Sequence, residues 1–148
     1  MGHPGEIRDC ALRLLARREH CASELRRKLR QRRFQPAAIE ALLAQLIAED
    51  ALSEQRYVEN FTRARMMRGF GPQRIKAELR EKAVCDSLIS RYVITGDERW
   101  DQQISRVWQK RFGGRLPENL KERAQQTRYL QYRGYTTEQI NRVLDNND

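Results

Sequence analysis

The feature that most constrains the fold of this chain is a spacing of apolar residues that occurs three times. Leu29, Phe34, Ile39, Leu42 and Leu43 are separated by 5, 5, 3 and 1 positions. The same separations recur fifty residues later, and again fifty-one residues after that. The second set is Leu79, Val84, Ile89, Tyr92 and Val93, and the third is Leu130, Tyr135, Ile140, Val143 and Leu144. Self-similarity at a fixed period predicts a repeat architecture.

Each set of this spacing is typical of a corner between two helices. One helix ends after its leucine, an apolar residue fills the corner, and a second helix presents a buried stripe. Pro36, Pro72 and Pro117 suit the first position of a helix, where the missing N–H is not needed. Thr136 and Gln139 make a capping box. Strand alternation is not convincing anywhere, so the sequence predicts an all-α fold.

Apolar residues upstream of each set add one further helix to each unit. The corresponding pairs are Ile7 and Ala11, Tyr57 and Phe61, and Trp108 and Phe112. We therefore expect three tandem three-helix repeats at residues 5–50, 51–98 and 99–148. Units of this size bury a modest fraction of their surface, so neighbours should share contacts in an elongated array. The four aromatic residues stand at repeat-equivalent positions, which are normally buried, so we interpret them as core residues. The alternative, a platform on which bases stack, needs exposed rings.

The charge of the chain predicts attraction to polyanions. Charged residues make up 33% of the sequence and the net charge is +9. By charge alone, nucleic acid, an acidic protein surface and an anionic membrane are all possible targets, and of these we expect no membrane to be a partner. For any single arginine, the alternative is a solvated helix face. As groups, two clusters are candidates for partner binding: Arg26, Arg27, Lys28, Arg30, Arg32 and Arg33, and then Arg63, Arg65, Arg68, Arg74, Lys76, Arg80 and Lys82.

The remaining composition indicates a reduced, cytoplasmic environment. No apolar run approaches the roughly 20 residues of a membrane span. Charged residues interrupt the N-terminus before a signal peptide could form. Three cysteines without a C-x-x-C spacing favour free thiols. We expect a monomer, because no unit has a sustained heptad seam.

No residue pattern indicates catalysis, a metal or a cofactor. His20 beside Cys21 is the one suggestion of a ligand pair, but adjacent helix residues point about 100° apart and no second pair follows. The acidic residues are scattered and form no acid–base pair. We therefore expect a protein that is not an enzyme.

The sequence Gly-Phe-Gly-Pro at residues 69–72 has two interpretations. It is not a nucleotide loop, because both the third glycine of a dinucleotide motif and the Gly-Lys of a Walker loop are missing. A helix-hairpin-helix corner would present backbone amides to a phosphate. The basic residues close to such a site are Arg68, Arg74 and Lys76. Alternatively, Gly69 ends one helix and Pro72 begins the next, which we favour. Phe70 is then the aromatic residue expected to be exposed.

Residues 51–84 strongly resemble the central signature of the RecX family, the regulators of the RecA recombinase. The matching residues are Leu52, Arg56, Tyr57, Phe61, Arg65, Gly69, Phe70, Gly71, Pro72, Arg74, Ile75, Glu78, Leu79 and Lys82. Residues 23–29 and 129–135 are similar to the first-unit and third-unit patterns of that family. Ala83 departs from the pattern, since the family often has glycine there.

The resemblance implies three tandem three-helix units and a non-enzymatic function. It implies that the chain binds the RecA nucleoprotein filament in its helical groove and inhibits its ATPase, strand-exchange and co-protease activities. The alternative is a general DNA-binding protein that uses the arginine clusters and the glycine corner on single- or double-stranded DNA. Salt distinguishes the two, because binding through several phosphates weakens by orders of magnitude between low and moderate salt.

Overall fold

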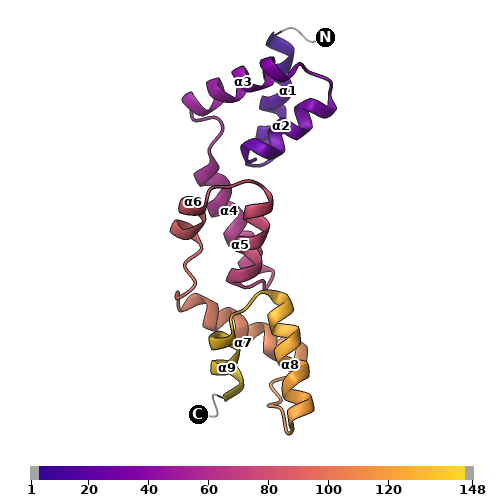
Figure 1. The fold of residues 1–148 in the computed structure, drawn as a ribbon, viewed down its shortest axis with the longest axis vertical. Helices are drawn as coiled ribbons and strands as arrows, with labels where there is room; N and C mark the ends of the chain where they lie inside the picture. Colours follow the sequence, from indigo (N-terminus) through magenta and orange to yellow (C-terminus); the bar gives the residue numbers. More distant parts are fainter. Residues whose placement is uncertain (1–3, 146–148) are drawn as a thin grey trace.

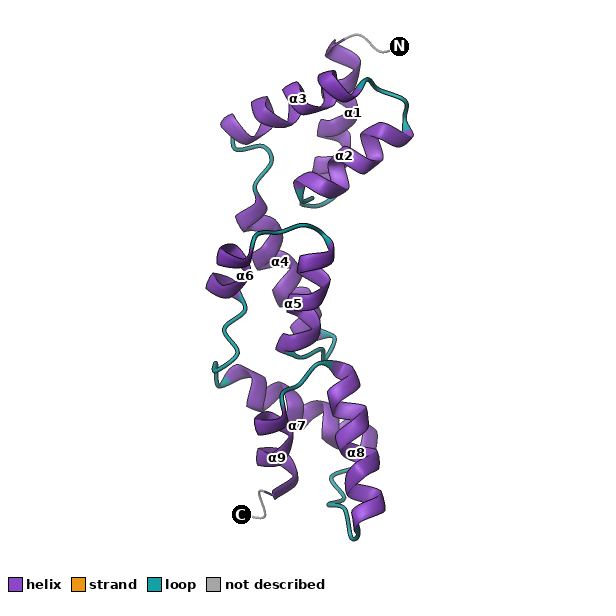
Figure 2. Cartoon of the chain, in the orientation of Figure 1, coloured by secondary structure: helices purple, strands orange, loops and turns teal. Residues whose placement is uncertain are grey.

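The computed structural model describes residues 4–145, and over that range the chain forms nine α-helices and no strand. This confirms the all-α prediction. The first unit contains α1 (Pro4–Arg17), α2 (Ala22–Gln31) and α3 (Pro36–Ala48), the second α4 (Glu54–Met67), α5 (Pro72–Glu81) and α6 (Asp86–Tyr92), and the third α7 (Arg99–Phe112), α8 (Leu120–Arg133) and α9 (Thr137–Asp145). The units follow one another along the longest axis of the molecule (Figures 1 and 2). None of the described helices is long and apolar enough to cross a membrane.

The repeated spacing of five residues corresponds to one hydrogen bond at the end of the second helix of each unit. The amide of the corner residue donates to the carbonyl of the leucine five positions earlier. The three bonds are Phe34 to Leu29 at 3.3 Å, Val84 to Leu79 at 3.2 Å, and Tyr135 to Leu130 at 3.2 Å. This is the long bond of a Schellman motif, which requires a left-handed residue just before the corner residue. Arg33, Ala83 and Gly134 hold that place, with φ of 65°, 60° and 104°.

Most helix boundaries agree with the sequence signals. Pro36 and Pro72 begin α3 and α5, and Thr136 and Gln139 exchange the two bonds of a capping box, at 2.9 and 3.1 Å. The prediction for Pro117 is wrong, since α8 begins three residues later. Asn119 caps that helix instead, and its side-chain oxygen accepts a hydrogen bond of 2.8 Å from the amide of Glu122.

The predicted correspondence between the first helices is wrong in the third unit. Residues 113–119 join α7 to α8, whereas only residues 68–71 join α4 to α5. Trp108 and Phe112 therefore lie in the last turns of α7, while Tyr57 lies in the first turn of α4 and Phe61 near its middle. Tyr57 and Trp108 are nevertheless buried, and the two phenylalanines are half-buried against the core.

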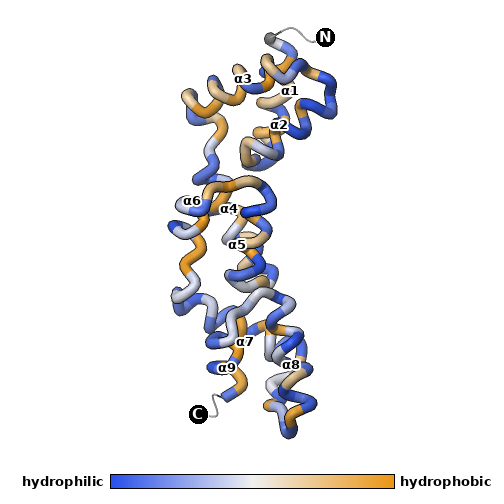
Figure 3. Tube along the Cα trace, viewed as in Figure 1, coloured by the Kyte–Doolittle hydropathy of each residue, from blue (hydrophilic) through white to orange (hydrophobic). Residues whose placement is uncertain are grey.

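The apolar side chains form two separate cores. One belongs to the first unit and includes Leu25, Leu29 and Leu46; it also takes in Leu52, the last residue before the N-cap of α4. The other runs without interruption through the second and third units and includes Ile75 and Leu79. Figure 3 shows α3 as a long hydrophobic stretch, whereas the other helices alternate more with hydrophilic residues.

Candidate polyanion-binding surface

The corner at residues 69–72 is structural. Gly69, at φ 85°, follows the end of α4, and Pro72 is the first residue of α5. The amides that a phosphate would need are already occupied. Gly71 donates to the carbonyl of Arg133 at 2.8 Å, and Gln73 donates to the carbonyl of Gly134 at 2.9 Å. The helix-hairpin-helix interpretation is therefore wrong, because the C-terminal end of α8 occupies the place of the anion.

The same corner joins the second unit to the third. A Cβ atom on Gly71 would lie 2.5 Å from the carbonyl group of Gly134, so the two backbones touch. The hydroxyl of Tyr135 donates to the carbonyl of Gly69 at 2.9 Å, and the guanidinium of Arg133 donates to the carbonyls of Gly69 and Arg68. The family-like residues of the second and third units thus meet in one contact.

Phe70 is half-buried, and the expectation that it is exposed is wrong. The guanidinium groups of Arg74 and Arg133 each lie 4.2 Å from its ring centre, and that of Arg65 lies 5.0 Å away. Cations over an aromatic face are attracted by its quadrupole, so the ring holds these side chains in place. The exposed aromatic residue is Tyr132, which the sequence analysis did not single out.

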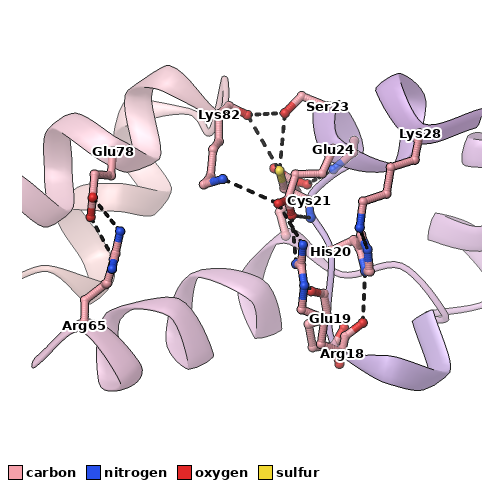
Figure 4. Close-up of polar contacts among 12 residues, drawn as sticks. Arg18, Glu19, His20, Cys21, Ser23, Glu24, Lys28, Arg65, Glu78 and Lys82 are labelled. Atoms are coloured by element: carbon pink, nitrogen blue, oxygen red, sulfur yellow. Dashed lines mark hydrogen bonds and ion pairs between the residues drawn. The ribbon is translucent and has the colours of Figure 1, made fainter. Parts of the chain in front are cut away.

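Most side chains of the second predicted cluster already make hydrogen bonds or ion pairs to other residues of the chain. Arg65 makes two hydrogen bonds to the carboxylate of Glu78, at 3.0 and 2.6 Å (Figure 4). The other internal contacts are Arg63 to Asn60, Arg74 to Glu78, Lys76 to Thr95, Arg80 to Asp86 and Lys82 to Glu24. Arg68 differs, because its exposed side chain makes no hydrogen bond or ion pair to a described residue.

The first predicted cluster is divided in the same way. Arg26 pairs with Glu40 at 2.7 Å, Lys28 contacts Nε2 of His20 at 2.8 Å, and Arg32 donates to the sulfur of Cys10 at 3.1 Å. Three exposed cations have no such contact among residues 4–145. They are Arg27, Arg30 and Arg33, on α2 and the corner after it.

A groove of about 460 Å³ between the second and third units gathers cations that the sequence analysis did not bring together. It lies where the end of α4 meets α7 and α8. Its apolar lining includes Met67, Val107 and Tyr129, and its cations are Arg68, Arg106, Lys110, Arg111 and Arg133. No acidic residue lines it. We call it the interunit groove; of its cations, only Arg68 was among the predicted site residues.

A second opening, of about 760 Å³, lies between the first and second units and has a different charge. Arg18, Arg65, Arg68 and Lys82 line it, but so do Glu19 and Glu24, over a floor that includes Tyr57 and Phe61. Arg18 makes two hydrogen bonds of 3.1 Å to Glu24 (Figure 4). Because Arg18, Arg65 and Lys82 already face carboxylates, this opening is a poor site for a polyanion.

No metal site is formed by the described part of the chain, in which no three His, Cys, Asp or Glu side chains come together. Cys10, Cys21 and Cys85 are free thiols.

The fold and the interunit groove together define a class of protein. It is a tandem three-helix repeat protein with a basic groove, lined by no acidic residue, between two of its units.

Comparison with known proteins specifies the class further. Models of the first, second and third three-helix domains of RecX match residues 8–46, 53–92 and 97–144. The chain is 45% identical over 141 residues to the regulatory protein RecX of Pseudomonas syringae pv. tomato, covering 95% of this chain and 91% of that protein. It is 46% identical over 138 residues to that of Pseudomonas fluorescens, covering 93% and 89%.

The fold is also similar to a solved structure. The crystal structure of RecX from Lactobacillus salivarius superposes with a TM-score of 0.80 at 20% identity, over 96% of each chain. The chain belongs to the RecX family.

Proposed function

We propose that this protein is a non-enzymatic regulator of the RecA recombinase. As a monomer in the cytoplasm, it binds the RecA nucleoprotein filament in its helical groove. Bound there, it inhibits the ATPase, strand-exchange and co-protease activities. Membership of the RecX family supports the regulatory role, since the relatives are named regulatory proteins.

The observation that carries the proposal on the structural side is the interunit groove. Five cations and no carboxylate line it. Several positive charges this close together make the local electrostatic potential strongly positive, so the groove attracts an acidic protein surface or a phosphate backbone. Arg68, Lys110 and Arg111 make no hydrogen bond or ion pair within residues 4–145, so a partner meets them without breaking one. The guanidinium of Arg111 does lie over the rings of Phe112 and Tyr129, at 5.7 and 5.2 Å.

The elongated array supports binding to a filament rather than to an isolated protomer. The exposed arginines of the first unit lie on α2 and the corner after it, whereas the interunit groove lies between the second and third units. The three units follow one another along the array (Figure 1). Two modest contacts on one chain bind a repetitive partner much more tightly than either does alone, because the second contact becomes intramolecular. The inhibition should therefore require assembled RecA.

The test is ATP hydrolysis by RecA on single-stranded DNA, with this protein titrated below one copy per RecA protomer. The order of addition and the salt concentration are varied, and binding to bare DNA is measured in parallel. Inhibition at low ratios with weak binding to bare DNA supports the proposal. Full ATPase activity throughout the titration, up to a ratio just below one to one, contradicts it.

Direct DNA binding is the second candidate, and the interunit groove is the observation in its favour. Phosphates suit arginine forks as well as carboxylates do. Inhibition that begins only at concentrations that coat the DNA, and that disappears steeply with salt, would favour this candidate.

A further inference from the structure

We propose that the first unit, α1–α3, swings as one body against the second and third units, which move together, and that the hinge lies at Ser53. This inference concerns the chain alone and does not depend on the proposed function. It follows from the difference between the two joints of the array.

The joint between the second and third units is built from backbone and core. Gly71 and Gln73 donate to the carbonyls of Arg133 and Gly134, so two main chains are paired directly. The apolar core continues across this joint. The linking segment is also held on both sides, since Trp100 donates to the carbonyl of Ile94 at 2.7 Å and Gln139 to that of Thr95 at 3.1 Å. Moving this joint would break buried contacts.

The joint between the first and second units is mainly polar. The hydroxyl of Ser23 donates to the carbonyl of Lys82 at 2.6 Å, and the Lys82 ammonium lies 3.4 Å from Glu24 (Figure 4). Three more polar contacts cross the joint: the amide of Ala22 donates to Glu54 at 2.6 Å, and Arg56 donates to Glu19 and to the carbonyl of Asp50, both at 2.7 Å. Within the described range, Cys21 is the one residue of α1–α3 and their connections that belongs to the core of the other two units.

Water reaches this polar joint. The opening of about 760 Å³ lies along it, and a second of about 590 Å³ is lined by Ser23, Glu24, Arg27 and Lys82. Side-chain hydrogen bonds and ion pairs that water can replace contribute little net stability, because the separated groups are solvated. Opening this joint therefore costs far less than opening the other.

The hinge lies at the peptide link between Leu52 and Ser53, where the chain passes from the first unit to the second. Leu52 is packed in the core of the first unit, and its amide bonds to the carbonyl of Leu46 at 3.1 Å. Ser53 already belongs to the second unit, because its side chain caps α4 by accepting from the amide of Arg56 at 3.2 Å. Rotation at these two adjacent residues turns one unit against the next without disturbing either core.

The test is a pair of distance distributions, measured by double electron–electron resonance on the full chain. Spin labels are attached through unnatural amino acids at exposed positions, so that the three cysteines stay in place. Ala44 and Ala77 report on the polar joint, and Ala77 and Arg128 report on the joint of the second and third units. We expect the first distribution to be at least twice as wide as the second.

Variants of the two joints make the test specific. Ser23→Ala, which removes the bond to Lys82, should widen the Ala44–Ala77 distribution and leave the Ala77–Arg128 distribution unchanged. Gly71→Ala is the matched variant and should do the reverse. Equal widths for both pairs in the unsubstituted chain would overturn the proposal, whether or not the variants fold. Widening of both distributions by Ser23→Ala would also overturn it.

Discussion

The amide of Gly71 donates a hydrogen bond of 2.8 Å to the carbonyl of Arg133, and this contact joins the family-like corner of the second unit to the end of α8. The corner thus binds a neighbouring helix end in the way that such corners elsewhere bind a phosphate. The contact leaves no room for side chains, because each of the two facing glycines would place a Cβ atom within 2.6 Å of the opposite unit.

Gly134→Ala should destabilise the protein by about 3 kcal/mol. A Cβ atom at this position would lie 2.4 Å from the Cβ of Arg74, and the residue has a φ of 104°. Left-handed backbone costs an L residue roughly 1–2 kcal/mol, and overpacking adds about 1–3 kcal/mol. Urea unfolding of the variant and of the unsubstituted chain measures the difference. A loss below about 1 kcal/mol would mean that the joint relaxes easily.

Ala83→Gly should stabilise the protein, by up to about 1 kcal/mol. Ala83 occupies the same left-handed place in the second unit as Gly134 does in the third, with φ 60°. Relief of the left-handed strain exceeds the entropy that glycine adds to the unfolded chain by a small margin. The same urea series measures it. Ala77→Gly, in the middle of α5, is the control and should destabilise, because glycine is a poor helix former.

Arg106→Glu with Lys110→Glu should raise the concentration needed to inhibit the RecA ATPase by about tenfold. The two residues line the interunit groove one helical turn apart on α7. Reversing each charge replaces an attraction with a repulsion, and two such changes amount to about 1–2 kcal/mol at a partly exposed site.

Lys121→Glu with Arg128→Glu is the control for the groove variant. It makes the same change of net charge on α8, outside the groove, and should leave inhibition within about twofold, as expected when distant surface charges are screened by salt. Equal loss in the two double variants would show that overall charge matters and the groove does not.

Acid should destabilise the first unit through Glu24, whose partners Arg18 and Cys21 lie in that unit, and should also weaken the contact of Glu24 with Lys82. Burial by itself raises the pKa of this carboxyl group, but hydrogen bonds from Arg18 and from the amide of Cys21, with the charges of Arg18 and Lys82, lower it from 4.5 to about 2. The unfolded chain therefore takes up a proton at a higher pH than the folded chain. The stabilisation is complete above pH 4.5 and is lost as the pH falls from there toward 2, by about 3 kcal/mol.

Thermal unfolding of Glu24→Gln between pH 7 and pH 3 measures this contribution. The variant should lose less stability over this range than the unsubstituted chain does. Glu138→Gln removes one exposed carboxylate from α9 and is the control. For Glu54 the effect of acid on stability has the opposite sign, since burial raises its pKa. If Glu24→Gln and the unsubstituted chain lost the same stability between pH 7 and pH 3, Glu24 would not supply the stabilisation.

His20 should bind a proton less readily in the folded chain than in the unfolded chain, and in its neutral form it should carry the proton on Nδ1. That nitrogen lies 3.0 Å from the carbonyl of Arg18, to which it donates, and Nε2 accepts from the ammonium of Lys28 at 2.8 Å. Burial, followed by the charges of Arg18 and Lys28, lowers its pKa, although the bond to the Arg18 carbonyl opposes this. Because the unfolded chain binds the proton first, stability falls as the pH drops below about 6.5. Nitrogen NMR of the ring identifies the tautomer, and a titration midpoint above 6.5 would contradict the assignment.

The helices and the corners could be predicted from the sequence because the interactions that form them are local. The bond from Val84 to Leu79 spans five positions, and a buried stripe recurs every turn, so both appear as spacings along the chain. The correspondence of α7 with α4 could not be predicted, because the longer connection at residues 113–119 follows no local rule.

The candidate site was predicted less well, for a physical reason. Charge in a sequence shows how many cations there are, but not which of them face a carboxylate. Arg65 and Arg74 were expected to bind a partner, and both lie against Glu78 and the ring of Phe70.

The sequence by itself determined the all-α repeat, most of the helix ends and the family, since these depend on contacts within about a turn or on the order of residue types. Only the tertiary structure decided where the glycine corner binds and where free positive charge gathers. Arg68 and Lys110 come from different units, and they line one groove because Gly71 and Arg133 bring those units together.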